Sequence, residues 1–320
     1  MKDVMLIDSL NSLFQLRHTK EKDVLWKFIS DLRDLMEQTH SHKTVLCCDT
    51  GSSAYRLAKY PAYKSDRKLR RENATPQEKA EMSVFFDTVS EFQKLAPMFG
   101  IEVSAIPKVE ADDILAFFTR EIDIATHRMS ILSSDTDLFQ LLRPGVRQRS
   151  YGPKMKLNKV DIPPEVWVTY DRFCEVFEMS PFQYMQAKSI AGDPGDSIYS
   201  PEGIGKETGF KLIRKYGSIE EVEKHLDELD IPRFSEAAKD NLRNEFWMVD
   251  RNVELVSLLH TPEKYEEIFG EGLALLEDIK DRLADPPKLD EESIKEWLFS
   301  TGRVNVYNDY DNWIRPFRGR

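Results

Sequence analysis

The sequence lacks the features of a secreted or membrane-spanning protein. It contains no apolar run near the 18 residues that a transmembrane helix requires. Residues 1–8 have neither a long apolar region nor a small-residue cleavage site, so we expect no signal peptide. Its three cysteines, Cys47, Cys48 and Cys174, form no Cys-x-x-Cys pair, and two are adjacent within an apolar run. This pattern indicates buried thiols in a reducing cytoplasm.

The chain also lacks an overall positive charge. Its 45 basic and 56 acidic residues give a net charge of −11, which on average disfavours nucleic-acid binding. The distribution differs from the average, because residues 56–79 hold eight basic and three acidic residues, and residues 143–159 hold six basic residues and no acidic one. Local patches determine phosphate binding, so both stretches are candidate phosphate-binding surfaces. The alternative for each is an ordinary solvated face.

Apolar strands alternate with helical patterns over the first 140 residues. Strands are predicted at residues 4–7, 44–48, 101–106 and 129–134, and helices at 24–36, 76–95 and 110–122, with a short helix ending at 142. Thr75 is the expected N-cap of the second helix and Pro76 its first residue. This alternation predicts an α/β fold with a doubly wound, mainly parallel sheet.

The rest of the chain is predicted to be mostly helical. Two short strands or a ribbon are expected at 143–159, a helical stretch from Pro163 to Phe177, and helices to about 275. We therefore predict domains at 1–178 and 179–275, followed by a C-terminal segment at 276–320. Within this segment we expect a helix at 292–299 and an aromatic stretch at 307–317 that packs back onto the core. A partner-binding tail is the alternative.

Acidic residues gather where predicted strands end. Asp8, Asp49 and Asp135 each follow a strand, and ligands of doubly wound sheets bind outside the carboxyl ends of the strands. Five acids lie in two short clusters, which are Glu110, Asp112 and Asp113, and then Asp135 and Asp137. Such crowding should raise carboxyl pKa values, and a hard divalent cation such as Mg²⁺ would offset it. Helix capping is the alternative, but a cap needs only one acid.

The second predicted domain opens with another acid pair. Asp193 and Asp196 lie in Gly-Asp-Pro-Gly-Asp, and a Gly203-Ile204-Gly205 turn precedes an amphipathic helix. This arrangement resembles a helix-hairpin-helix, in which glycines let the backbone approach a phosphate. Positive charge comes from Lys206, Lys211, Arg214 and Lys215. A plain turn between helices is the alternative for the Gly-x-Gly pattern alone.

These motifs, taken in order, resemble the flap endonuclease / 5′-3′ exonuclease superfamily, and within it the stand-alone bacteriophage-type 5′-nucleases. The resemblance covers residues 4–275. It rests on Ile7-Asp8-x-x-Asn11, Cys48-Asp49, Tyr55-Arg56 with Tyr60-Pro61-x-Tyr63-Lys64-x-x-Arg67, Val109-Glu110-Ala111-Asp112-Asp113, Ser134-Asp135-x-Asp137-Leu138-x-Gln140-Leu141, Gly192-Asp193-x-x-Asp196 and Gly203-Ile204-Gly205. Ser9 stands where the family has glycine after the first aspartate.

The resemblance implies a nuclease core of the PIN type, a helical arch at about residues 52–98 and two or three divalent ions, Mg²⁺ with Mn²⁺ as a substitute. It implies a first metal site at Asp8, Asp49, Glu110, Asp112 and Asp135, and a second at Asp137, Asp193 and Asp196, with Asp113 nearby. It places Lys64 and Arg67 on the arch as catalytic residues that contact the scissile phosphate. Tyr63 would stack a base. The further implied DNA-binding residues are Arg56, Arg70, Arg71, Gly203, Gly205, Lys206, Lys211, Arg214 and Lys215, with K⁺ at the hairpin turn.

The function so implied is a metal-dependent, structure-specific 5′-nuclease. Expected substrates are DNA with 5′ flaps, nicks or free 5′ ends and RNA primers paired to DNA during replication. A sliding clamp or a single-strand-binding protein is an expected partner. The protein should be monomeric, in the host cytoplasm if viral, with no membrane partner. No polymerase sequence follows, so the nuclease is expected to act as a separate chain.

Two other functions remain open. An aspartyl phosphatase would need an aspartate two residues after Asp8, where Leu10 stands. A non-catalytic module could bind DNA junctions through residues 200–216. Crowded carboxylates would then repel the phosphates of its ligand, so this second reading leaves the acid clusters unexplained.

Overall fold

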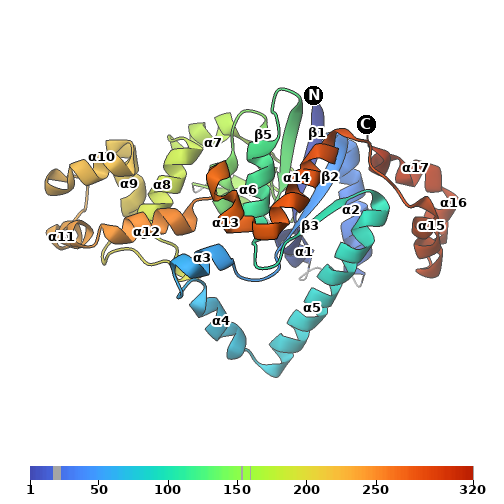
Figure 1. The fold of residues 1–320 in the computed structure, drawn as a ribbon, viewed down its shortest axis with the longest axis horizontal. Coiled ribbons are helices and arrows are strands. Elements are labelled where there is room, and N and C mark those ends of the chain that lie inside the picture. The colour runs from blue at the N-terminus through green and yellow to red at the C-terminus, as the bar shows by residue number, and fades with distance from the viewer. Residues whose placement is uncertain (17–22, 153, 159, 320) are drawn as a thin grey trace.

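A six-stranded sheet forms the centre of the protein. The computed structural model describes residues 1–16, 23–152, 154–158 and 160–319. The strand order is β3-β2-β1-β4-β5-β8, and every strand except β8 runs parallel to its neighbours (Figure 1). The strands are β1 (Lys2–Asp8), β2 (Ser41–Cys48), β3 (Glu102–Ala105), β4 (His127–Leu132), β5 (Val146–Arg149) and β8 (Val168–Thr169), with a separate hairpin of β6 (Met155–Leu157) and β7 (Val160–Ile162). The predicted α/β fold with a mainly parallel sheet is confirmed.

Side chains from both faces of the sheet are buried. Along β1, Val4 and Leu6 join one apolar cluster and Met5 and Ile7 the other, because successive strand residues point to opposite faces. The first face is covered by α6 (Ala111–Glu121), α13 (Tyr265–Phe269) and α14 (Leu273–Asp281), and the second by α1 (Ser9–Leu16), α2 (Val24–Thr39) and the buried side of α5 (Pro76–Leu95). The central strands are therefore enclosed, and only their carboxyl ends are available for a site.

Three helices form an arch below the sheet edge. They are α3 (Ala54–Lys59), α4 (Ser65–Glu72) and α5, and the last two extend away from the core and meet at the tip of a V (Figure 1). Thr75 caps α5 in a capping box with Glu78, as the sequence predicted. No residue of α4 is buried, so polar contacts at its base, not an apolar face, hold this helix in place.

A helical region lies beside the sheet. It comprises α7 (Tyr170–Phe177), α8 (Pro181–Ala191), α9 (Lys206–Tyr216), α10 (Ile219–Lys224), α11 (Glu236–Asn244) and α12 (Trp247–Val256). A Cβ at Gly209 would lie 2.5 Å from the carbonyl oxygen of Ala187, so glycine allows α9 to pack closely on α8. After α12 the chain returns to the sheet through α13 and α14. The predicted domain limits stay a prediction.

One predicted helix begins later than expected. The segment after Pro163 first forms a turn and then β8, which pairs with β5 at Arg147 and Gln148. Helix α7 starts only at Tyr170, with Thr169 as its cap. The helix therefore does not begin at the two prolines, because the residues after them pair with the edge of the sheet. No described helix is long and apolar enough to cross a bilayer.

The C-terminal segment packs back onto the core, as predicted. It forms α15 (Glu291–Ser300), α16 (Val304–Asn308) and α17 (Tyr310–Ile314) beside α2. Trp313 stacks on Trp26 with ring centroids 5.7 Å apart, and Phe317 lies 5.0 Å from Phe99. Arg303 lies 4.8 Å above the ring of Trp26. These contacts attach the last thirty or so residues to the second face of the sheet.

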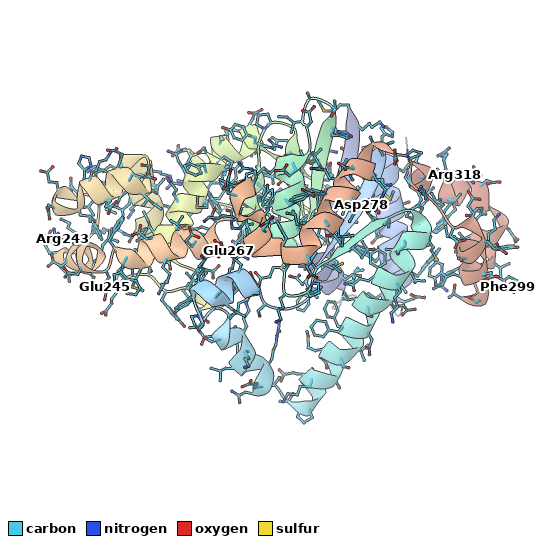
Figure 2. All side chains as sticks on the ribbon, in the orientation of Figure 1. Arg243, Glu245, Glu267, Asp278, Phe299 and Arg318 are labelled. Atoms are coloured by element: carbon cyan, nitrogen blue, oxygen red, sulfur yellow. The ribbon has the colours of Figure 1, made fainter. Side chains whose placement is uncertain are left out.

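Replacing Phe317 should destabilise the whole protein. Its side chain is fully buried, so Phe317→Ala is expected to lower the free energy of unfolding by about 3–5 kcal/mol, which urea unfolding would measure. The matched control is Phe299→Ala, whose side chain is 66% exposed at the outer end of the segment (Figure 2) and should change stability by less than about 0.5 kcal/mol. Equal midpoints for the two variants would show that the segment is only loosely attached.

Candidate active site

The predicted acids converge at the carboxyl edge of the sheet. Asp8 is the last residue of β1, Asp49 follows β2, and Asp135 lies shortly after β4. Glu110 and Asp112 stand at the start of α6. All five carboxylates line one cavity, whose other residues include Lys64, Arg67 and Arg71 from the arch. The cavity thus has an acidic wall on the sheet and a basic wall on the arch.

Several of these acids also organise the loops that carry them. Asp8 accepts hydrogen bonds from the Asn11 backbone N–H at 3.1 Å and from the Ser133 hydroxyl at 2.8 Å. Asp49 accepts one from the Ala111 N–H at the start of α6, and Asp135 accepts one from the Asp137 N–H. The capping alternative is therefore partly correct. Capping does not account for the Asp112 carboxylate, which accepts no hydrogen bond from a nearby backbone N–H within the described residues.

Burial and mutual repulsion make these carboxylates hard to ionise. Burial, with the charge of Asp49 as the next cause, raises the pKa of Asp8 to about 8. Burial and Asp137 raise the pKa of Asp135 to about 6. The pKa of Asp112 also rises, through burial and through Asp135 and Asp8, and burial raises the pKa of Asp49. A divalent cation would favour the ionised form of all of them.

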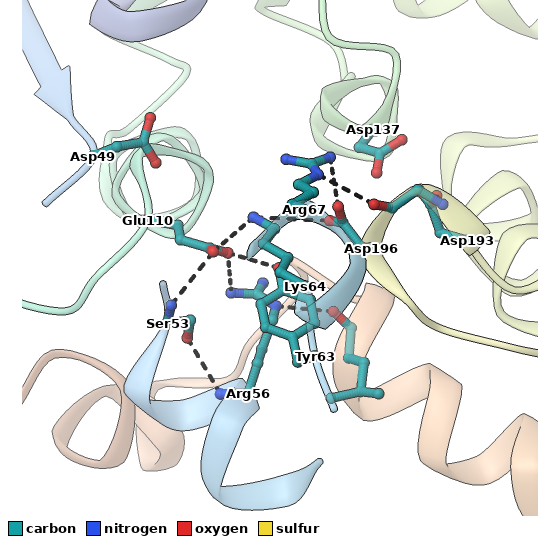
Figure 3. Close-up of polar contacts among 12 residues, drawn as sticks. Asp49, Ser53, Arg56, Tyr63, Lys64, Arg67, Glu110, Asp137, Asp193 and Asp196 are labelled. Carbon is teal, nitrogen blue, oxygen red and sulfur yellow. Dashed lines mark hydrogen bonds and ion pairs between the residues drawn. The ribbon is translucent and has the colours of Figure 1, made fainter. Parts of the chain in front are cut away.

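The second predicted metal set lies across the arch base. Lys188 of α8 bridges two of its members, contacting Asp137 and lying 3.6 Å from Asp193. Lys64 in turn lies 2.6 Å from Glu110 and 3.7 Å from Asp196, and Arg67 lies 2.5 Å from Asp196 (Figure 3). The sequence analysis missed Lys188. Its signal was a lysine one helical turn before the Gly192-Asp193 motif.

The carboxylate oxygens of the site suit a hard divalent ion, and in this structure they contact the ammonium groups of two lysines. Carboxylate oxygens are the ligands that Mg²⁺ prefers. Among the described residues, no three His, Cys, Asp or Glu side chains converge closely enough to hold one ion. Lys64 and Lys188 each bridge two of the carboxylates in question. Their ammonium groups therefore balance part of the negative charge of these carboxylates.

Arg56 and Asp113 form a buried ion pair instead of the predicted contacts. The Arg56 guanidinium donates to both carboxylate oxygens of Asp113 at 2.6 and 2.8 Å and to Glu110 at 3.2 Å. Both residues are almost fully buried, and the Nε2 atom of His260 lies 3.3 Å from Asp113. Despite burial, Arg56 holds the pKa of Asp113 well below its usual range. Arg56 and Asp113 thus have each other as partners in this structure, and the predicted roles of Arg56 in DNA binding and of Asp113 beside the second metal site stay predictions.

Tyr63 is also buried in this structure, and its predicted base stacking stays a prediction. It is 5% exposed, and its hydroxyl donates to Glu110 at 2.9 Å. Glu110 thus receives three side chains from the arch base, namely those of Arg56, Tyr63 and Lys64. The Ser53 backbone N–H is a fourth donor at 3.3 Å. This carboxylate connects the arch to the acidic wall.

The other predicted DNA-binding residues differ in exposure and in whether they already have partners within the protein. Arg70 and Arg71 are exposed on α4, and Gly203, Gly205 and Lys206 are exposed before and at the start of α9. By contrast, Lys211 binds Glu207 and the Pro232 carbonyl, Arg214 binds the Phe177 carbonyl, and Lys215 contacts Asp230. Those three already have protein partners, so a phosphate would have to compete for them.

The second basic stretch is not one continuous surface. Arg143 donates to the backbone carbonyls of Thr119 and Ile122 at the end of α6. Arg147 lies 3.2 Å from Asp3 and 4.1 Å from the ring of Trp167. Lys159 lies outside the described residues. The prediction that this stretch forms a phosphate-binding surface is therefore wrong for Arg143 and Arg147, which have internal structural partners.

Breaking the Arg56–Asp113 pair should cost much of the protein's stability. Arg56→Met leaves Asp113 buried without its main partner, so the free energy of unfolding should fall by about 3–5 kcal/mol in urea titrations. The control is Lys59→Met on the same helix, whose ion pair with Glu267 is exposed and should contribute less than about 1 kcal/mol. A loss as small as the control's would mean that the buried pair does not hold α3 in place.

Removing the charge of Asp8 should stabilise the metal-free protein. Because its folded pKa is raised, the folded state binds more protons than the unfolded state, and stability falls as pH rises toward about 8. With a chelator present, the free energy of unfolding of Asp8→Asn should therefore exceed that of the unchanged protein by more than about 1 kcal/mol at about pH 9. The difference should be smaller at about pH 5. Asp87→Asn, an exposed substitution on α5, is the control and should show no such pH dependence. A pH-independent difference at Asp8 would contradict the repulsion.

Comparisons with known proteins agree with this geometry. Residues 4–168 match the family model described as 5′-3′ exonuclease, N-terminal resolvase-like domain. The flap endonuclease of Escherichia phage T5 is 27% identical over 262 residues, covering 80% of this chain and 84% of the relative. The structure of T5 5′-exonuclease with zinc bound matches 89% of this chain and all of that chain, with a TM-score of 0.74 and 23% identity. A T5 D15 flap endonuclease complex with DNA and metal ions has a TM-score of 0.70, again with 23% identity. The match to the family model spans more than half of the sequence, and the chain therefore belongs to the 5′-3′ exonuclease family.

Proposed function

We propose that the protein is a divalent-metal-dependent, structure-specific 5′-nuclease that hydrolyses phosphodiester bonds at 5′ flaps, nicks and free 5′ ends. The observation that carries this proposal is the single cavity with carboxylates on the sheet wall and Lys64, Arg67 and Arg71 on the arch wall. A phosphodiester is an anion, and its hydrolysis needs both positive charge on the phosphate and an activated water. Family membership and the name of the T5 relative support the same chemistry.

The acids would hold the metal ions in two groups. Asp8, Asp49, Glu110, Asp112 and Asp135 would hold one ion, and Asp137, Asp193 and Asp196 a second, with Mg²⁺ as the ion of choice. Bound divalent ions at such a site activate water and stabilise the attacking and leaving oxygens of an in-line displacement. The protein supplies the fixed positions, because Asp8, Asp49 and Asp135 are attached to the ends of buried strands.

Lys64 and Arg67 would exchange partners when substrate binds. Burial opposes the charge on Lys64, but Glu110 and Asp196 more than offset it, so the pKa of Lys64 is raised and its ammonium is charged. Lys64 contacts Glu110 and Asp196, and Arg67 contacts Asp196, so both cations would be free to turn toward the scissile phosphate where these carboxylates hold metal ions instead. The cations would then orient the phosphate and stabilise the charge that develops on it.

The remaining basic groups would position the duplex. Exposed Arg70 and Arg71 on α4, and Lys206 with the glycine turn at the start of α9, suit phosphate contacts on either side of the cavity. K⁺ at the glycine turn and removal of RNA primers during replication fit this arrangement and belong to the proposal. Binding should weaken steeply as salt concentration rises.

Substituting one acid from each group tests the proposal. Asp135→Asn and Asp193→Asn should each lower cleavage of a 5′-flap substrate in Mg²⁺ by more than about 100-fold, because ligand loss should exceed the effect of losing an outer partner. Asp281→Asn, at an exposed site on α14, is the matched control and should cleave normally. Cleavage would be followed in single-turnover reactions with 5′-labelled flap, nicked and RNA-primed duplexes.

Unchanged cleavage by both variants would refute the assignment of the acids. Tight flap binding without cleavage in Mg²⁺ or Mn²⁺ would instead support the non-catalytic junction-binding alternative.

A further inference from the structure

A second cavity lies on the helical region and shares no lining residue with the active-site cavity. It is a groove between the N-terminal half of α8, the start of α10, the face of α12 and the segment that follows α12. Its lining includes Phe182, Met185, Gln186, Ile219, Val253 and Leu259. Nothing in the proposed nuclease chemistry uses this surface.

The rim of the groove is strongly acidic. It carries Glu220, Glu223 and Asp250, together with Glu254, whose charge is balanced by Lys264. The one lysine in the lining, Lys264, is bound to Glu254 at 2.8 Å, so its charge is already neutralised. This rim would repel a DNA backbone and an acidic peptide alike, whereas it would attract a cationic ligand.

The floor of the groove is apolar. Met185 and Ile219 lie at its base with little exposure, and Phe182 is 53% exposed beside them. Val253 and Leu259 are partly exposed in the lining. An exposed aromatic ring beside an apolar floor and a charged rim is typical of a binding surface for an amphipathic side chain or segment.

One buried acceptor in the groove has no donor. The side chain of Gln186 is 3% exposed, and its Oε1 atom is buried with no hydrogen-bond partner within the described part of the chain. An unsatisfied buried carbonyl is unfavourable, and an N–H group entering the groove would remove that cost. This acceptor is therefore a polar atom of the groove that a hydrogen-bond donor would satisfy.

We propose that this groove docks a basic peptide segment of a protein partner. Lysine or arginine side chains would place their charged ends on the Glu223 and Asp250 rim and their aliphatic stems along the floor. An apolar residue of the same segment would contact Phe182 and Ile219, and a peptide or side-chain N–H would satisfy Gln186. A small polyamine would match the charge but would leave the apolar floor uncovered, so the peptide is the better fit.

The test uses the full chain and a defined probe. A random dodecapeptide phage-display library is selected on the immobilised protein, and we expect enrichment of peptides that combine Lys or Arg with apolar residues. A fluorescent copy of the enriched sequence is then titrated by anisotropy. Glu223→Lys with Asp250→Lys should weaken binding about tenfold or more, as expected for reversed charges at an interface. Gln186→Leu should weaken it several-fold without changing the charge.

The matched control reverses two charges outside the groove. Glu277→Lys with Asp281→Lys on α14 makes the same change in net charge and should leave the affinity within about twofold. All variants should keep flap cleavage, which reports that they are folded. The proposal is overturned by selection of acidic peptides or of none, or by equal effects of the groove and control variants. Saturable spermidine binding without peptide binding would also overturn it, as would self-association that the groove variants abolish.

Discussion

Repulsion among buried carboxylates is the constraint around which this protein is arranged. The acids lie at the ends of strands that are buried on both faces, so they cannot move apart to relieve their charge. The structure offsets the repulsion with cations from outside the sheet, Lys64 from the arch and Lys188 from α8. The same arrangement that is unfavourable without metal prepares oxygen ligands for a divalent ion.

The arch and the helical region are coupled through this site. The backbone N–H of Lys64 donates to the Asp196 carbonyl, and Arg67 Nε donates to the Gly195 carbonyl. Gln140, near the sheet edge, binds the backbone of Val256 and Leu258 at the end of α12. Arg56 reaches the Leu255 carbonyl at the same point. The candidate site thus lies between regions that the sequence predicted to be separate domains, and these contacts fix the two regions relative to one another.

Local patterns predicted what depends on local structure. Apolar runs predicted the strands, Thr75-Pro76 predicted the start of α5, and the strand ends predicted the convergence of Asp8, Asp49 and Asp135. The burial of Arg56 could not be predicted from the sequence, because it depends on α3 packing against α12, some 199 residues away along the chain. A motif that reads as a charged surface in sequence became an internal ion pair once those segments met. Lys188 escaped notice for the same reason, since only the fold brings it to Asp137.

The aromatic cluster at the C-terminus has a consequence for spectroscopy. Of the five tryptophans, Trp26, Trp297 and Trp313 lie within it, and none of the five is among the residues that line the active-site cavity. Trp247 is largely exposed on α12, and Trp167 lies beneath Arg147. Three of the five tryptophans therefore report, through their fluorescence, on the contact between the last helices and α2. Tryptophan fluorescence will report the integrity of that end of the molecule. It should change little when substrate enters beneath the arch.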